Sequence, residues 1–166
     1  MTTRPLHKAK VKVLTWLKLA IDISSKKRGP EAILSNFTEN HFVFDGVDCG
    51  GMEGFLQSLK HEDMAKQKRV CALYGVKAKR KGTWRWMENQ TIYWKGQSIN
   101  RHSDEFQVLV RSAFRAMYEQ CPKFREALSD TGNKKLYHTI GKQDTQKTIL
   151  TEKEFCDILT ELRKEL

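Results

Sequence analysis

An acid, an amide and an amine occur at helical spacing in residues 52–60. Glu53, Gln57 and Lys60 stand at positions i, i+4 and i+7, so a helix would carry all three in one stripe. A half-buried lysine loses its proton readily because burial disfavours the charged form, and a neutral amine attacks carbonyl carbons to form Schiff bases. Glu53 could act as a general acid or base, and Gln57 could orient a sugar hydroxyl. An ordinary Glu–Lys pair on a solvated helix has the same spacing, so the pattern alone leaves both interpretations open.

The flanking sequence predicts the elements that would position these side chains. Apolar residues in the same segment occupy a neighbouring sector and should face a core. Residues 41–44 predict a short strand, which the Asp45-Gly46 turn ends. Alternating apolar residues predict two further strands, over residues 10–23 and 91–99.

Four more helices are predicted along the chain. The first covers residues 63–81, the second begins after Ser103, and the third runs from Pro122 to a point before Gly132. The last starts at the capping box formed by Thr151 and Glu154. Helices mixed with a few short strands, without regular βαβ alternation, predict a single helix-rich α+β domain.

Length and composition narrow the class of protein. The chain has 166 residues, of which 39% are hydrophobic and 30% charged, which is typical of one globular domain. No apolar run approaches the roughly 20 residues that cross a bilayer, and no secretory signal is recognisable, so we expect a cytoplasmic protein without a membrane segment. The cysteines are widely spaced, which predicts free, buried thiols: Cys49, Cys71, Cys121 and Cys156.

The net charge of +10 is concentrated in parts of the chain. Residues 1–30 hold eight Lys or Arg against the single acid Asp22, and a second basic concentration covers residues 66–81. This balance suits a polyanionic partner such as nucleic acid, although a basic surface kept for solubility would look the same. We expect residues 1–30 to form a strand and a loop attached to a main domain of residues 31–166.

Two further groups of residues could contact a nucleotide. Asn36 and Phe37 could bind a base or ribose through an amide and a ring face, or could be a turn asparagine beside a core phenylalanine. Trp84, Trp86 and Trp94 lie among basic residues, a combination that suits stacking on bases. The alternative, ordinary core tryptophan, applies better to Trp94 in its strand. Metal-ligand spacing is absent, as are the Walker A, G-x-S-x-G and G-x-G-x-x-G motifs.

Taken together, three segments resemble the NADAR superfamily, also called YbiA-like. Its hallmarks are an L-S-N-F segment, a strand ending in D-G and an E-x-x-x-Q-x-x-K helix. This chain has Leu34-Ser35-Asn36-Phe37, then Phe42 to Gly46, then Glu53, Gln57 and Lys60. A further match is the L-x-x-T-G segment at Leu128, Thr131 and Gly132, and the similarity runs from about Ile33 to Leu166.

The resemblance implies a YbiA-like fold and N-glycosidase activity, without a cofactor or a metal. Members split the bond between a base or amine and a ribose that carries phosphate or ADP. Lys60 would be the Schiff-base nucleophile at the sugar C1, and Glu53 its proton-transfer partner. The substrate contacts that the resemblance implies are Asn36, Phe37, Gln57, Trp94, Arg101, Thr131 and Gly132.

Three functions remain open on the sequence. The first is removal of ADP-ribose from a modified guanine in DNA or RNA, which the basic charge favours and which would suit a phage or bacterial defence setting. The second is the same chemistry on a ribose-phosphate intermediate of riboflavin synthesis. This chain lacks the family's D-x-x-W-G segment, which weakens that second hypothesis. The third is a non-catalytic module that binds ADP-ribose or nucleic acid.

Overall fold

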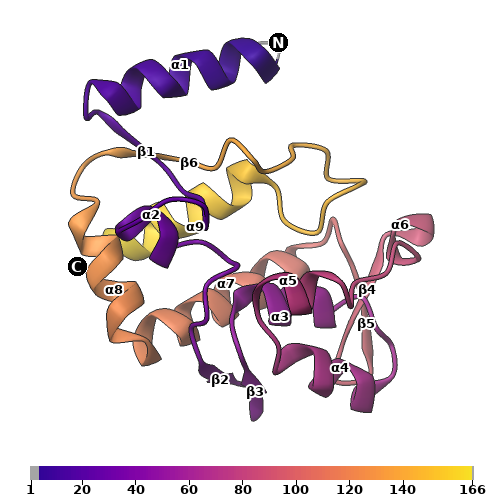
Figure 1. Cartoon of the computed structure of the whole chain (residues 1–166). Helices are drawn as coiled ribbons and strands as arrows, with labels where there is room; N and C mark the ends of the chain where they lie inside the picture. The colour runs from indigo at the N-terminus through magenta and orange to yellow at the C-terminus, as the bar shows by residue number, and fades with distance from the viewer. Residues whose placement is uncertain (1–3, 166) are drawn as a thin grey trace.

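The structure is a computed structural model in which residues 4–165 are described. Within that range, helices of four to seventeen residues are mixed with short strands (Figure 1). In chain order the elements are α1 (Arg4–Trp16), β1 (Ala20–Asp22), α2 (Pro30–Ile33), β2 (Phe42–Phe44), β3 (Val47–Cys49), α3 (Met52–Ser58), α4 (Met64–Cys71), α5 (Gly75–Lys79), α6 (Trp86–Asn89), β4 (Thr91–Trp94), β5 (Gln97–Asn100), α7 (Asp104–Gln120), α8 (Pro122–Asp130), β6 (Lys135–Tyr137) and α9 (Glu152–Arg163).

The strands of the described chain pair two by two. β1 and β6 are parallel, with Ile21 opposite Leu136, whereas β2–β3 and β4–β5 are antiparallel hairpins. Both hairpin turns, Asp45-Gly46 and Lys95-Gly96, have positive φ at both residues, as two-residue hairpin turns require. The short strand predicted at 41–44 is confirmed, but the strand predicted at 91–99 is a hairpin with its turn in the middle.

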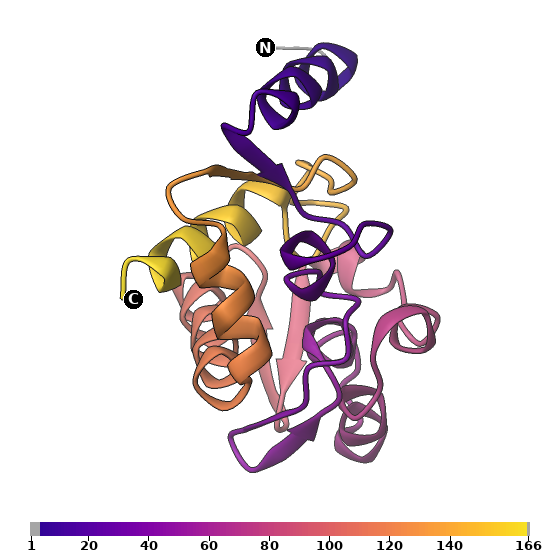
Figure 2. The same cartoon turned by 60° about the vertical axis from the view of Figure 1, so that its left-hand side comes forward.

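The strand predicted over residues 10–23 is wrong for most of its length. Residues 4–16 form the helix α1, and only Ala20–Asp22 are a strand. Residues 7, 11 and 14 are spaced as on one helix face, and Val11 and Leu14 pack with Ala20 and Tyr137. The competing alternation of lysine and valine at 10–13 was the misleading signal. Figures 1 and 2 show α1 outside the main body, next to β1.

 The helix predicted over residues 63–81 is interrupted. The chain leaves α4 at Cys71 and begins α5 at Gly75, whose φ of 53° is a left-handed value that favours glycine. The break lets the carbonyl groups of Cys71 and Leu73 lie against α3 at Gly54, where any Cβ would collide with them. Close packing of two backbones therefore overrides the helical periodicity of residues 63–81.

The remaining predicted helices are confirmed. The side chain of Ser103 caps α7, Pro122 begins α8, and Thr151 with Glu154 forms the capping box of α9. Their apolar faces meet in the main core together with α3, whose Met52, Phe55, Leu56 and Leu59 are all at most 2% exposed.

The fold class is therefore confirmed as a single helix-rich α+β domain with short strands. The four cysteines are free and buried, as predicted. Across residues 4–165, no helix has both the length and the apolar character that a membrane crossing needs.

Candidate active site

A cavity of about 350 Å³ lies beside α3. Five segments line it: residues 35–37 after α2, one side of α3 with the turn that follows, the end of α5, residues 138–150 after β6, and Phe155 of α9. It brings together five residues that the sequence singled out, although they are up to 24 positions apart: Asn36, Phe37, Glu53, Gln57 and Lys60. Its volume is within the range of small-molecule sites.

Glu53 is held in place by its neighbours. Its side chain is buried, and its Oε1 atom accepts a hydrogen bond from Nε2 of Gln57 at 2.7 Å. The same Oε1 lies 3.2 Å from Nζ of Lys79, at the end of α5. The backbone N–H of Glu53 donates to the carbonyl oxygen of Asn36, which ties the L-S-N-F segment to the start of α3. The carboxylate is therefore fixed by a charge-assisted network.

Lys60 lies just beyond the end of α3 rather than within it. Its backbone N–H still donates to the carbonyl oxygen of Gln57, so the turn continues the helical path that the spacing predicted. Burial, assisted by the positive charge of Lys79, lowers the pKa of Lys60 from 10.5 to about 8, while Glu53 opposes this change. A substantial fraction of the amine is therefore neutral near physiological pH.

Gly82 packs closely against the side chains of Gln57 and Lys60. A Cβ on Gly82 would collide with Oε1 of Gln57 and would lie 3.4 Å from Nζ of Lys60. The segment after α5 can therefore pack directly on the Gln57 amide only because residue 82 lacks a side chain. Beyond it, Nζ of Lys60 lies 5.7 Å from the ring centre of the buried Trp86.

Asn36 carries an unsatisfied polar atom at the cavity. Within residues 4–165, its Oδ1 atom is buried and has no hydrogen-bond partner. Buried polar atoms of folded proteins are nearly always paired, so such an exception calls for an explanation. A ligand that donates a hydrogen bond to Asn36 would supply one.

Several lining residues were missed by sequence reasoning. Lys79, Lys142 and Lys147 add three amines to the cavity that holds Lys60, against the one carboxylate of Glu53. His138 also lines it, with its Nδ1 2.8 Å from the carbonyl oxygen of Ile23. The basic composition of these segments was visible in the sequence, but their approach to α3 depends on the tertiary fold. The lining favours an anionic ligand.

Four of the predicted substrate contacts lie outside this cavity lining. Trp94 packs between Phe44 and Phe55, and its Nε1 donates to Asp45, so it is part of the core. Thr131, fully buried, donates to the carbonyl oxygen of Leu128 at the end of α8, and the adjacent Gly132 is exposed there. The contacts of Trp94 and Thr131 lie within the fold, and the role of all three residues as substrate contacts stays a prediction.

Arg101, the fourth, is also structural in its contacts. It is 1% exposed, forms an ion pair with Glu154 at 2.6 Å and stacks over Phe106. Its Nε donates to the carbonyl oxygen of Thr148, a residue that does line the cavity. Arg101 therefore supports the wall of the cavity from behind.

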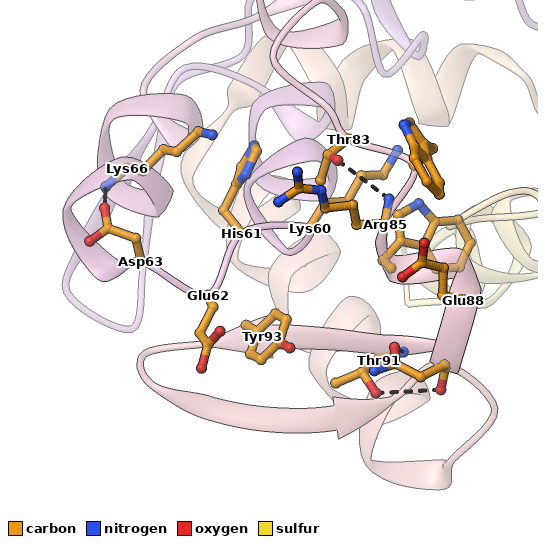
Figure 3. Close-up of a pocket in the computed structure, with 13 residues that line it drawn as sticks. Lys60, His61, Glu62, Asp63, Lys66, Thr83, Arg85, Glu88, Thr91 and Tyr93 are labelled. Atoms are coloured by element: carbon orange, nitrogen blue, oxygen red, sulfur yellow. Dashed lines mark hydrogen bonds between the residues drawn. The ribbon is translucent and has the colours of Figure 1, made fainter.

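Two neighbouring hollows adjoin the candidate site. One, of about 610 Å³, shares Gly141, Lys142 and Lys147 with it and extends toward Arg4 and His7 of α1. The other, of about 650 Å³, shares Lys60 and is lined by residues 60–66 and 83–93 (Figure 3). Within residues 4–165, no three His, Cys, Asp or Glu side chains are grouped so that they could hold a metal ion.

Comparisons with known proteins agree with this architecture. The family model for bacteriophage protein GP30.3 matches residues 28–164. A 17.1 kDa protein from the Gp30–rIII intergenic region of enterobacteria phage T4 is 38% identical over 149 residues, covering 88% of this chain and 98% of that protein. The NMR structure of YbiA from E. coli matches with a TM-score of 0.60 and 19% identity, over 89% of this chain and 84% of YbiA. The last similarity confirms the YbiA-like fold expected from the sequence.

Proposed function

Because the chain belongs to the bacteriophage GP30.3 protein family and has a YbiA-like fold, we propose that it is an N-glycosidase that uses Lys60 as its nucleophile. The substrate is an ADP-ribose group attached through C1 of its ribose to a base in nucleic acid. The observation that carries this proposal is an amine with a pKa of about 8 in the same cavity as a buried, hydrogen-bonded carboxylate.

The chemistry follows from these two groups. Opening of the ribose ring leaves C1 doubly bonded to the base nitrogen, and the neutral Nζ of Lys60 adds to C1. The bond between C1 and the base nitrogen then breaks, and the Glu53 carboxylate relays to that nitrogen the protons that Nζ loses, so that the base leaves as a neutral amine and Nζ keeps the double bond to C1. Water hydrolyses the remaining imine between Nζ and C1, which releases ADP-ribose as an aldehyde and restores the amine.

The environment of Glu53 suits a proton-transfer role. Its polar side-chain contacts with Gln57 and Lys79 both involve Oε1. These contacts fix the orientation of the carboxylate, which lets Oε2 be directed at a substrate without reorganisation of the site. Gln57 is thus a positioning residue for Glu53.

The basic lining supports a substrate that carries phosphate. Lys79, Lys142 and Lys147 surround the cavity, and the adjoining hollow continues from the latter two residues toward Arg4. A diphosphate with a second nucleoside would extend from the first cavity into the second. This continuity favours ADP-ribose over a single ribose phosphate, and the net charge of +10 favours attachment to nucleic acid.

A trapping experiment tests the nucleophile directly. Free ADP-ribose has an aldehyde at C1 in its open form, so it should form an imine with Lys60 that borohydride reduces to a stable adduct. Mass spectrometry of the digested protein should place the adduct on Lys60, and Lys60→Met should abolish it. The matched control is Lys77→Met, which removes an exposed lysine from α5 and should leave the yield unchanged.

Turnover is then measured with ADP-ribosylated DNA. The wild-type protein should release ADP-ribose, and Lys60→Met should not. The affinity of the protein for a nucleic-acid substrate should fall steeply with added salt, whereas its affinity for a ribose-phosphate metabolite should fall much less. Release that persists in Lys60→Met would refute the Schiff-base mechanism, and binding without any release would favour the non-catalytic module.

A further inference from the structure

The hollow on the far side of Lys60 is as large as a nucleotide-binding site. It measures about 650 Å³, and its lining comes from the turn after α3, the start of α4, the segment around α6 and the hairpin strand β4. Figure 3 shows Lys66 and Asp63 at one end, Arg85 and Glu88 at the other, and Lys60 between them. Lys60 lines both this hollow and the first cavity.

An exposed aromatic side chain borders this hollow. Trp84 is 62% exposed and lies in its lining, together with Tyr93. The neighbouring Trp86 is 3% exposed and belongs to the core, so the two tryptophans have different roles. An indole at the edge of a cavity provides a flat surface on which a heterocycle can stack.

The polar lining complements the amino groups of a base. Glu62, Asp63 and Glu88 contribute carboxylates, and Asp63 is already engaged, since it accepts the N–H of Lys66 as the cap of α4. Glu88 is exposed on α6, on the same short segment as Trp84. A carboxylate accepts hydrogen bonds from the N–H groups on the edge of a nucleobase.

We propose that this hollow is the leaving-group subsite, in which an amino-bearing base of single-stranded nucleic acid stacks on Trp84 and donates to Glu88. The inference rests on the proposed function, because it assigns the ADP-ribose to the cavity beside α3 and its extension toward Arg4, and the base to the hollow that Trp84 borders. Lys60, which lines both, then lies at the bond that breaks. A base inside a duplex is stacked and enclosed, so the occupant is an unpaired base.

The basic residues around the hollow fit the rest of the strand. Lys66 and Arg85 line it, and the exposed Lys81 precedes Trp84 by three residues. Their charges would contact the phosphates on either side of the unpaired base. Each end of the hollow thus carries a cation for the backbone next to an acid, and Glu88 is the acid on the same segment as Trp84.

Unmodified oligonucleotides test the subsite without any turnover. The probe is an eight-residue thymidine strand containing one guanine, and its partner carries hypoxanthine instead, which lacks only the 2-amino group. We expect the wild-type protein to bind the guanine strand more tightly, and Trp84→Ala to weaken that binding by at least about fivefold. Glu88→Ala, which removes the acceptor, should remove the preference for guanine over hypoxanthine.

The matched control is Trp16→Ala, which removes an indole that is 80% exposed on α1, outside the hollow. It should leave binding unchanged. Equal binding by wild type and Trp84→Ala would overturn the subsite even if Lys60 is trapped by ADP-ribose. The opposite result is also informative. If Trp84→Ala weakens binding but the wild-type protein forms no Lys60 adduct, the subsite is supported and the proposed reaction is refuted.

Discussion

Replacing Lys60 with methionine should make the folded protein more stable at neutral pH. Lys60 is charged in the unfolded chain below pH 10.5, but its folded-state pKa is about 8 because burial disfavours the charge. Folding therefore carries a free-energy cost at pH 7 that an uncharged side chain of similar length avoids. Methionine fits because it is unbranched and adapts to irregular spaces.

The size and pH dependence of this gain follow from the two pKa values. The interval from about 8 to 10.5 corresponds to at most about 3 kcal/mol in the free energy of unfolding. In that interval the unfolded wild-type chain binds more protons than the folded one, so wild-type stability rises with pH. The advantage of Lys60→Met should therefore be complete below pH 8 and disappear as the pH rises through 10.5.

Urea unfolding of both proteins at pH 7 and pH 10.5 measures the difference. Comparison at each pH cancels the titration of other groups, which both chains share. Lys77→Met, at an exposed position, should change the free energy of unfolding by less than about 0.5 kcal/mol at either pH. A Lys60→Met effect that is the same at both pH values would refute the lowered pKa and, with it, the neutral nucleophile.

Three further predictions concern the site and its surroundings. The rate of Lys60 trapping by ADP-ribose should rise with pH up to about 8, and Lys79→Met should move this rise to higher pH, because it removes a positive charge that lowers the Lys60 pKa. Gly82→Val should slow trapping by about 100-fold, because the new side chain displaces Gln57, and circular dichroism should show an intact fold. Thr131→Val should cost about 1–3 kcal/mol in urea unfolding, because Arg163 loses one of its two acceptors, but should leave the trapping rate unchanged.

The positions of Glu53 and Gln57 were more predictable than the extent of the cavity that they line. Glu53 and Gln57 are one helical turn apart, so local spacing alone placed them together, and the capping box at Thr151 fixed the start of α9 in the same way. Local signals of this kind depend on neighbours in sequence. They succeed because the interacting groups belong to the same element.

The sequence was least informative for segments whose conformation or position is set by tertiary packing. α1 is a helix because Val11 and Leu14 pack against Tyr137, a contact that no local alternation reveals. Lys142 and Lys147 enter the cavity because the chain after β6 passes over α3, about 85 residues distant in sequence, and single-sequence periodicity carries no record of that approach. Thr131 matched a family motif, yet its hydroxyl is used within the fold.

The expected stability gain in Lys60→Met also bears on why a lysine is present. Its amine is largely buried and lies among other cations, and its lowered pKa predicts a cost in stability at neutral pH, so the fold itself has little need of it. A residue that costs stability and lines two cavities is best explained by chemistry performed between them. Both effects must then occur in one variant: Lys60→Met must gain stability and lose the adduct. A variant that gained stability while ADP-ribose was still trapped at the site would separate the buried amine from the reaction and refute the assignment.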